Sequence, residues 1–397
     1  MTTLRVMDLF CGTGGFSKGF ENTGAFRVDY GVDLLPVAVE TFSMNHPQAV
    51  ALTADIRSIR LSSVADQMGL SPEEPAVIIG GPPCQGFSSI RPFRSTHEDD
   101  PRNSLFEEFA SYVNYFRPPV FVMENVVGLA THKKGFTIEQ IQDCFDSLGY
   151  SSDWRIMNAA HFGIPQKRER LVLVGAQSGI KITFPSPTHA GQFKTIGVKD
   201  RSRHLLPPPS TDEPSLFMSE ELKLPVALGV MEAIDDLPPV AAGECITEYV
   251  LPPQNDYQLA RRRNATRLDW HVATGHTKRM LAIIRHAGSN ITAIPQHLIS
   301  SGFSSSYSRL DPDCPAVTLT VNFVHPASNK CIHPFQDRAL TLREGARLQS
   351  FDDDFQFAGS RTQIAKQIGN AVPPLLGQAI AESVIDMLSG HPNEQIQ

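Results

Sequence analysis

Apolar runs of strand length alternate with polar and glycine-rich stretches through the first half of the chain. Each run is short enough to be a buried strand, and helical stretches separate several of them. The runs are Leu4–Phe10, Phe26–Asp33, Leu52–Ile56, Ala76–Ile79, Val120–Met123 and Leu171–Gly175. Strands that alternate with helices are typical of a largely parallel sheet with helices on both faces. We therefore predict an α/β domain over residues 1–187.

The pattern changes near Pro185, where prolines become frequent and periodic apolar runs become rare. Helical periodicity returns with Leu340–Gln349, in which Thr341 and Glu344 have the spacing of a capping box. A last apolar helix is expected over Leu375–Leu388. The expected divisions are a smaller loop-rich domain over 188–335, a hinge with the capped helix over 336–364, and a C-terminal helix returning to the first domain over 365–397.

The composition is that of an ordinary globular protein, with 41% hydrophobic and 19% charged residues among 397. No apolar run approaches the length of a membrane span, so we expect a cytoplasmic protein without a signal peptide or membrane partner. Six cysteines are present, but no pair has the spacing of a metal site or of a secreted disulfide framework. We expect a monomer with no bound metal.

The net charge of −7 argues mildly against a nucleic-acid partner, but the charge is unevenly distributed. Between Tyr257 and Arg309, eight Lys and Arg residues stand against one acidic residue, Asp269. This stretch is either a surface that faces DNA phosphates or a solvated helix face. The candidate DNA contacts in it are Arg261, Arg262, Arg263, Arg267, Lys278 and Arg279.

A glycine-rich turn follows the first predicted strand and opens a helix, an arrangement that lets a ligand approach the backbone and the helix N-terminus. The nicotinamide dinucleotide fingerprint requires a third glycine where this chain has Ser17, so that match fails. Asp33 and Asp55 end the next two predicted strands, where carboxylates can bind ribose hydroxyls or simply cap helices. Together the three strand ends predict a nucleoside pocket.

Cys84 stands on a loop directly after the predicted strand Ala76–Ile79. Pro82 and Pro83 fix an extended backbone before it, and Gly86 permits tight geometry after it. A thiol packed in a core needs neither feature, whereas a nucleophile on a loop needs a fixed backbone. The stretch by itself leaves both interpretations open.

Glu124 follows the predicted strand Val120–Met123, where partial desolvation would raise its pKa and let it hold a proton near neutral pH. The alternative is a carboxylate bound by backbone amides. Arg168 and Arg170 alternate with Glu169, so both guanidinium groups could lie on one face and bind phosphate or carbonyl oxygens.

Six ordered stretches resemble the motif series of the DNA cytosine methyltransferases that act at carbon 5, of the prokaryotic restriction-modification type. They are DLFCGTGGF, GPPCQGFS, ENV, QKRER, REGARLQSF and GNAVPP. The resemblance spans nearly the whole chain except about 187–305, the variable target-recognition region of the family. It implies a Rossmann-like, S-adenosylmethionine-dependent methyltransferase sheet, methyl transfer to a cytosine flipped out of double-stranded DNA, and a cognate restriction endonuclease as a genetic partner.

The resemblance also implies roles for single residues. Cys84 matches the nucleophile, and Glu124 matches the carboxylate that contacts the flipped cytosine. Arg168 and Arg170 match the paired arginines near the base and its phosphate. The positions expected around S-adenosylmethionine are Phe10, Cys11, Gly12, Thr13, Gly14, Gly15, Asp33, Leu34, Asp55, Ile56, Pro83, Leu105, Asn370 and Val372. Further candidates for DNA contact are Gln85 and Ser88.

Three positions depart from the family pattern without removing a catalytic group. Cys11 replaces the usual Ala or Ser, Asp33 replaces a common Glu, and Leu34 replaces a frequent aromatic residue. The alternatives are an RNA cytosine methyltransferase, a silent DNA-binding protein and a nicotinamide-dependent dehydrogenase. The long region between QKRER and REGARLQSF favours a DNA reader, the intact Cys84 and Glu124 disfavour a silent protein, and the missing third glycine disfavours a dehydrogenase.

Overall fold

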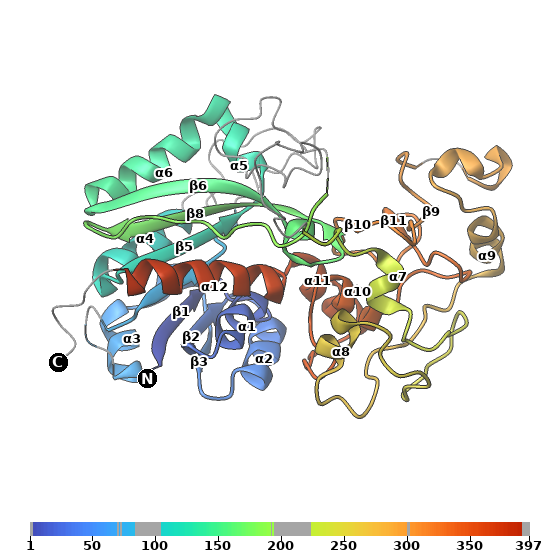
Figure 1. Cartoon of the computed structure of the whole chain (residues 1–397), viewed down its shortest axis with the longest axis horizontal. Coiled ribbons are helices and arrows are strands. Elements are labelled where there is room, and N and C mark those ends of the chain that lie inside the picture. Colours follow the sequence, from blue (N-terminus) through green and yellow to red (C-terminus); the bar gives the residue numbers. More distant parts are fainter. Residues whose placement is uncertain are drawn as a thin grey trace, which may run out of the picture. The chain divides into compact units, whose positions relative to one another are not determined.

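The computed structural model describes residues 3–69, 71, 74–83, 105–191, 193, 224–299 and 302–390. The predicted site residues Cys84, Gln85 and Ser88 lie outside the described residues. The chain divides into two compact units (Figure 1). The first unit takes its described residues from 1–158, 169–223 and 374–397, and the second from 159–168 and 224–373.

A seven-stranded sheet forms the centre of the first unit, in the order β3-β2-β1-β4-β5-β8-β6. Its strands are β1 (Leu4–Leu9), β2 (Phe26–Asp33), β3 (Val50–Thr53), β4 (Val77–Gly80), β5 (Val120–Asn125), β6 (Tyr150–Asn158) and β8 (Glu169–Gln177). Neighbouring strands are parallel from β3 to β5, whereas β8 is antiparallel to both β5 and β6. The predicted α/β fold is confirmed, with β6 as a strand that the apolar pattern did not indicate.

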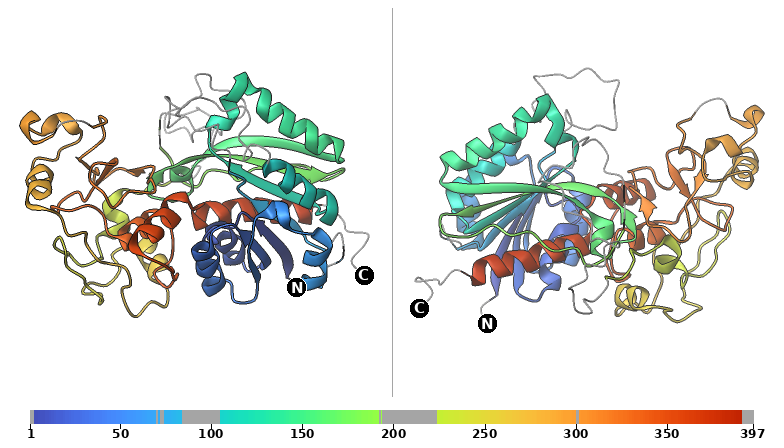
Figure 2. Two further views of the ribbon diagram at one scale, coloured as in Figure 1. Left: turned by 180° about the vertical axis from the view of Figure 1, so that it is seen from behind. Right: turned by 45° about the horizontal axis from the view of Figure 1, so that its top comes forward.

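Helices cover both faces of this sheet (Figure 2). They are α1 (Gly15–Asn22), α2 (Pro36–Asn45), α3 (Leu61–Met68), α4 (Leu105–Phe116), α5 (Gly128–Thr131), α6 (Phe136–Ser147) and α12 (Pro374–Ser389). Helices α3, α4 and α6 build the main apolar core on one face. Helices α1 and α12 pack so closely on each other that a methyl group on Gly19 would lie 2.4 Å from the Pro374 carbonyl oxygen.

Alternation along β1 assigns its side chains to these two layers. Met7 and Leu9 join the core of α3, α4 and α6. Asp8 points to the other face, where it is buried and accepts a hydrogen bond from Ser17 of α1 (Oγ to Oδ2, 2.6 Å). Burial raises the pKa of Asp8 to about 7, against the opposing effect of the Ser17 hydrogen bond.

The order of the strands reverses between β1 and β4. From β1 the chain moves outward to β2 and β3, and it then returns to place β4 on the other side of β1. In open α/β sheets, ligands bind at the carboxyl ends of the strands beside such a reversal. The glycine-rich turn leaves β1 at this edge, and the loop leading to Cys84 leaves β4 at the same edge because the two strands are parallel.

Short elements and long connections make up the second unit. Its helices are α7 (Val230–Ile234), α8 (Asp256–Arg262), α9 (Lys278–Arg285), α10 (Leu342–Leu348) and α11 (Arg361–Asn370). Its short strands pair in parallel, β7 (Gln166–Lys167) with β10 (Ala316–Val317) and β9 (Ser308–Arg309) with β11 (Lys330–Ile332). The predicted capping box forms at α10, where the amide of Glu344 donates to Thr341 Oγ1 at 3.1 Å and the amide of Thr341 donates to Glu344 Oε2 at 2.7 Å.

Buried arginine–carboxylate pairs connect the segments of the second unit. Arg347 is fully buried, with Nη1 at 3.1 Å from Asp236 Oδ1 and Nη2 at 2.6 Å from Asp353 Oδ2. Burial alone would lower the pKa of Arg347, but the two aspartates raise it. Arg338 binds both carboxylate oxygens of Glu344, at 2.6 and 2.8 Å. The pair of Arg347 with Asp236 joins stretches 111 residues apart, whereas the pairs of Arg347 with Asp353 and of Arg338 with Glu344 are local.

The two units divide the chain differently from the expected domains. Helix α10, expected in a hinge, lies in the second unit, and all seven of its residues are buried. Residues 159–168 also belong to the second unit, although they fall inside the expected first domain. Within the described part of the chain, no helix is long and apolar enough to cross a membrane.

We expect Arg347→Met to lower the free energy of unfolding of the second unit by about 3–5 kcal/mol, because the substitution leaves Asp236 and Asp353 buried without their cation. The chain has two tryptophans, and in a Trp154→Phe background Trp270 fluorescence reports urea unfolding of this unit.

Arg285→Met is the matched control, because its side chain is 71% exposed and its nearest carboxylate, on Asp337, lies 3.8 Å away. It should change stability by less than about 0.5 kcal/mol. Equal effects of the two substitutions would contradict a stabilising role of the buried pairs.

Candidate active site

The turn after β1 has an unusual backbone. Phe10 has φ 62°, in the left-handed region that non-glycine residues rarely adopt, and Gly12 and Gly14 have φ 52° and 82°. A left-handed residue with a side chain costs of order 1–3 kcal/mol and is typical of functional sites. The turn thus folds the chain tightly back from β1 into α1 and leaves backbone amides at the carboxyl edge of the sheet.

Asp33 joins this turn to the end of β2. Its Oδ2 accepts a hydrogen bond from the Gly12 amide at 3.0 Å, and its Oδ1 accepts one from the Leu35 amide at 2.8 Å. The Ala54 amide donates to the Asp33 carbonyl at 3.1 Å, which adds the end of β3. Burial raises the pKa of Asp33, while the backbone hydrogen bonds oppose the rise. The ends of three predicted strands therefore meet at Asp33, two through its carboxylate and one through its backbone carbonyl.

Cys11 lies in the same turn and is buried. Burial raises the pKa of its thiol well above the usual range, and the charges of Asp8 and Asp33 raise it further. Because the thiolate is the reactive form, this environment disfavours Cys11 as a nucleophile.

Several features of the turn fit a polar ligand with an apolar ring. Thr13 is buried, and its Oγ1 has no hydrogen-bond partner within the described residues. A side chain added at Gly12 would meet no described atom within 4 Å, so there is open space beside the turn. Leu34 is 63% exposed directly after Asp33, although it is a large apolar residue. A buried hydroxyl and an exposed apolar surface beside a carboxylate suit a nucleoside.

Asp55 and Ile56, which follow β3, are less available for contact with a ligand than Asp33 is. Arg57 binds the Asp55 carboxylate, with Nη2 at 2.5 Å from Oδ2, and this hydrogen bond lowers the pKa of Asp55. Asp55 also caps the short helical turn Ile56–Ser58 through the Arg57 amide at 3.1 Å. Ile56 itself is buried in the core. A contact between Asp55 and a ligand would have to compete with Arg57.

Glu124 and Arg170 form an ion pair at the carboxyl end of β5, with Arg170 Nε 2.7 Å from Glu124 Oε1. The two strands that carry them are antiparallel, so β8 begins where β5 ends and Asn125 lies opposite Leu171. The side chains are 13% and 14% exposed, and burial lowers the pKa of Arg170 against the effect of Glu124. The charged pair is thus largely shielded from solvent and fixed in position.

The loop after β4 is held against the end of β5. Asn125 is buried, and its Nδ2 donates to the Pro82 carbonyl at 3.0 Å. A methyl group on Gly81 would lie 3.0 Å from Glu124 Oε2, so the loop backbone passes directly beside the carboxylate. The sequence analysis did not identify Asn125 as a site residue. Its one signal was a polar side chain directly after Glu124, at the end of a buried strand.

A family signature covers almost all of the chain. The signature of the C-5 cytosine-specific DNA methylases matches residues 4–386. The chain belongs to this family. The resemblance carried by the six motifs is therefore confirmed, and the enzyme is a cytosine methyltransferase that acts on DNA.

This methylase is similar to bacterial Type II methyltransferases along its length. It is 33% identical to M.AgeI of Thalassovita gelatinovora, over 96% of this chain and 99% of the relative. It is 36% identical to M1.HphI of Haemophilus parahaemolyticus, over 97% of this chain and 87% of the relative. A solved structure described as a DNA modification methyltransferase encoded within an E. coli prophage matches 98% of the chain with a TM-score of 0.73 and 23% identity, which supports the fold.

Arg168 of the methylase, which the resemblance matches to one of the paired arginines near the base and its phosphate, does not share the surroundings of Arg170. It is fully buried in the second unit, where Nη1 donates to the Gly369 carbonyl at 3.1 Å and Nη2 to the Asn370 carbonyl at 3.3 Å. Arg168 therefore stabilises the end of α11 and leaves no exposed surface for a substrate. Val372 follows in the same segment and is half-buried, while Leu105 is buried at the start of α4 in the first unit.

The basic stretch divides into residues that pair with carboxylates of their own unit and exposed residues without such a pair. Arg261 is buried and paired with Asp352 at 2.7 Å, and Arg262 is paired with Asp236 at 2.6 Å. Arg263 Nε lies 3.0 Å from Asp352 Oδ2. These three arginines neutralise carboxylates of their own unit, and Arg263, which follows the end of α8, does so while its side chain stays 38% exposed. Among the described residues of this unit, the predicted contacts that remain exposed without such a pair are Arg267, Lys278 and Arg279.

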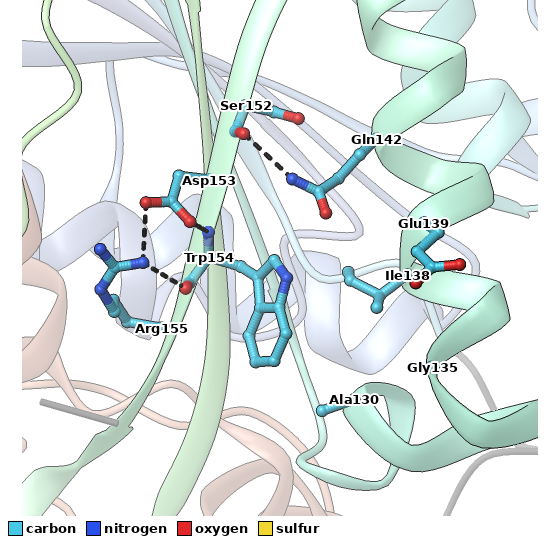
Figure 3. A pocket seen from close by; sticks show the side chains of 9 residues that line it. All are labelled: Ala130, Gly135, Ile138, Glu139, Gln142, Ser152, Asp153, Trp154 and Arg155. Atoms are coloured by element: carbon cyan, nitrogen blue, oxygen red, sulfur yellow. Dashed lines mark hydrogen bonds and ion pairs between the residues drawn. The ribbon is translucent and has the colours of Figure 1, made fainter. Parts of the chain in front are cut away.

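A pocket of about 630 Å³ lies between α6 and β6 (Figure 3). Its polar groups bind one another, with Gln142 Nε2 at 3.0 Å from the Ser152 carbonyl and Arg155 Nη1 at 2.7 Å from Asp153 Oδ2. None of the residues that line it belongs to the predicted site, so we assign the pocket no role in methyl transfer.

Glu124→Gln should lower kcat by about 100-fold or more, because an amide cannot deliver the proton of a general acid. Binding of S-adenosylmethionine should change less than about twofold, since the carboxylate lies beside the β4 loop and not beside the glycine-rich turn. Steady-state kinetics and calorimetric titration measure the two effects. Glu139→Gln, exposed on α6, is the control. Equal losses of turnover and cofactor affinity would argue against the proton-donor role.

Proposed function

We propose that this methylase transfers a methyl group from S-adenosylmethionine to carbon 5 of a cytosine that is flipped out of a specific duplex DNA sequence. The observation that supports this most directly is the Glu124–Arg170 ion pair beside Gly81, three residues before Cys84. Cys84 itself lies outside the described residues, and its role rests on its place in the loop that Asn125 anchors.

The residues have distinct chemical tasks in this proposal. The Cys84 thiolate adds to carbon 6 of cytosine and forms a sulfur–carbon bond, while ring nitrogen 3 takes up a proton that the Glu124 carboxylate acquires before the addition. Arg170 holds the carboxyl group of Glu124 in position. The addition makes carbon 5 electron-rich, and S-adenosylmethionine, when bound, supplies an electrophilic methyl group for it. Transfer of the carbon-5 proton to a base, departure of the thiolate and return of the nitrogen-3 proton to Glu124 restore the aromatic ring.

We assign the cofactor to the crevice between the glycine-rich turn and the end of β2. The turn Phe10–Gly15 offers backbone amides and the Thr13 hydroxyl, Asp33 offers a carboxylate for ribose hydroxyls, and Leu34 offers an exposed apolar surface for the base. Pro83 and Leu105 remain proposed contacts in the first unit. The expected contacts Asn370 and Val372 belong to the second unit.

The DNA must supply the energy for flipping through its contacts with the protein. Extrusion of a paired base costs roughly a few kcal/mol, which phosphate and groove contacts have to offset. We propose that the exposed Arg267, Lys278 and Arg279 of the second unit bind phosphates, together with Gln85 and Ser88 near the nucleophile. The likeness to Type II methyltransferases supports a cognate restriction endonuclease as genetic partner. A monomer in the cytoplasm would suffice for this activity.

Cys84→Ser should lower methyl transfer to DNA by more than about 1,000-fold, because the substitution removes the covalent nucleophile. Bisulfite sequencing of a plasmid propagated with the active enzyme first identifies the target site. Transfer from labelled S-adenosylmethionine is then measured on a duplex with that site and, separately, on tRNA. Cys144→Ser, on α6, is the matched control and should retain activity.

Two results would contradict the proposal in different ways. Wild-type activity in Cys84→Ser would rule out the nucleophile, and transfer to tRNA but not to duplex DNA would rule out the substrate. A duplex with 5-fluorocytosine at the target should trap the wild-type protein as a covalent complex, because fluorine cannot leave carbon 5 as a proton.

A further inference from the structure

His46 connects the end of α2 to the glycine-rich turn. Its ring is 1% exposed, with Nε2 at 3.2 Å from the Gly14 carbonyl oxygen and Nδ1 at 2.9 Å from Glu21 Oε2. The Phe42 ring lies against the imidazole, with centroids 4.5 Å apart. A polar side chain so deeply buried, with both nitrogens in contact with polar atoms, is held in a single orientation.

Both neighbours of the His46 ring accept hydrogen bonds. The Gly14 carbonyl oxygen can only accept, and an ionised Glu21 carboxylate can only accept. The two contacts are therefore satisfied together when both ring nitrogens carry hydrogen. Glu21, on α1, then orients the ring, and Nε2 donates a hydrogen bond to the Gly14 carbonyl.

The Gly14 carbonyl is the point where the turn becomes a helix. It accepts the first helical hydrogen bond, from the Lys18 amide at 2.8 Å, and the Gly14 amide donates to the Cys11 carbonyl at 2.8 Å. The turn also has no room to shift towards α2, because a methyl group on Gly14 would lie 2.4 Å from His46 Nε2. The orientation of the peptide groups at the start of α1 therefore depends on the contact between the His46 ring and the Gly14 carbonyl.

Helix α2 connects the two parts of the proposed cofactor site, the Asp33–Leu34 segment and the Gly14 peptide. It begins at Pro36, directly after the exposed Leu34 and Leu35, and it ends one residue before His46. Within the helix, Phe42 lies so close beneath β2 that a methyl group on Gly31 would be 2.4 Å from its ring. The helix thus fixes the spacing between the Asp33–Leu34 segment at one end and the Gly14 peptide at the other.

We propose that His46 is a positioning residue for the methyl donor: by holding the Gly14 carbonyl, it keeps the amides of the glycine-rich turn at the spacing that the cofactor requires. The proposal rests on the assignment of S-adenosylmethionine to this crevice. His46 does not touch the reacting atoms. Its loss should therefore weaken cofactor binding and leave the chemical step unchanged once the cofactor is bound.

Two substitutions separate the two contacts of the ring. The amide of His46→Gln reaches the place of Nε2, so this variant can still donate to the Gly14 carbonyl. The amide of His46→Asn reaches only the place of Nδ1. This variant therefore keeps the contact with Glu21 and loses the hydrogen bond to the Gly14 carbonyl. We expect the dissociation constant for S-adenosylmethionine to rise about tenfold in His46→Asn and less than about threefold in His46→Gln.

The binding measurement is calorimetric titration of S-adenosylmethionine without DNA, with thermal unfolding of each variant as a check on the fold. At saturating cofactor, kcat on DNA should stay within about twofold of the wild type in both variants. Ser43→Ala is the matched control, because Ser43 is exposed on α2 and donates to the Val39 carbonyl of its own helix at 2.9 Å. It should bind the cofactor like the wild type.

Three outcomes would overturn the inference. The first is equal affinity in the Asn and Gln variants, the second is wild-type affinity in the Asn variant, and the third is a loss of kcat that persists at saturating cofactor. A wild-type protein that does not bind S-adenosylmethionine at all would instead overturn the proposed function. Wild-type binding with an unaffected Asn variant would leave the function intact and remove only the role of His46.

Discussion

Arg170 reaches Glu124 because β8 runs antiparallel to β5, and this reversal of one strand organises the catalytic edge of the first unit. A parallel strand in that place would start at the opposite edge of the sheet and leave Glu124 without a cation. Asn125 adds a second connection, since its amide holds the loop that leads from β4 to Cys84. A carboxylate, a cation and the start of the loop after β4 are thereby brought to the ends of adjacent strands.

At the carboxyl ends of β1 and β2, hydrogen bonds to a strained turn take the place of an ion pair. The left-handed backbone at Phe10 is unfavourable by itself, and it persists because Asp33 holds the turn from the side of β2. Burial at this edge also suppresses the reactivity of Cys11, since a buried thiol beside two aspartates does not ionise readily. This environment disfavours Cys11 as a nucleophile, and Cys84 remains the proposed one.

The two units obtain their stability in different ways. The first unit buries an apolar core under α3, α4 and α6. The second unit has few regular elements and relies on buried ion pairs such as Arg347 with Asp236 and Asp353. Arginines in such a unit cannot be interpreted as a DNA surface from the sequence. Three of the six basic residues that the charge pattern selected are occupied by carboxylates of the same unit.

The sequence by itself determined the family, the α/β fold and the identity of the chemical groups, because these depend on local order: apolar runs, glycine and proline at fixed positions, and Glu124 after a buried strand. The tertiary structure decided which groups meet. Arg170 pairs with Glu124 while Arg168 is buried against Gly369, although they are two residues apart. Asn125, His46 and Asp236 gain their contacts from partners that only folding brings within hydrogen-bond distance, and such long-range partners leave no periodic trace along the chain.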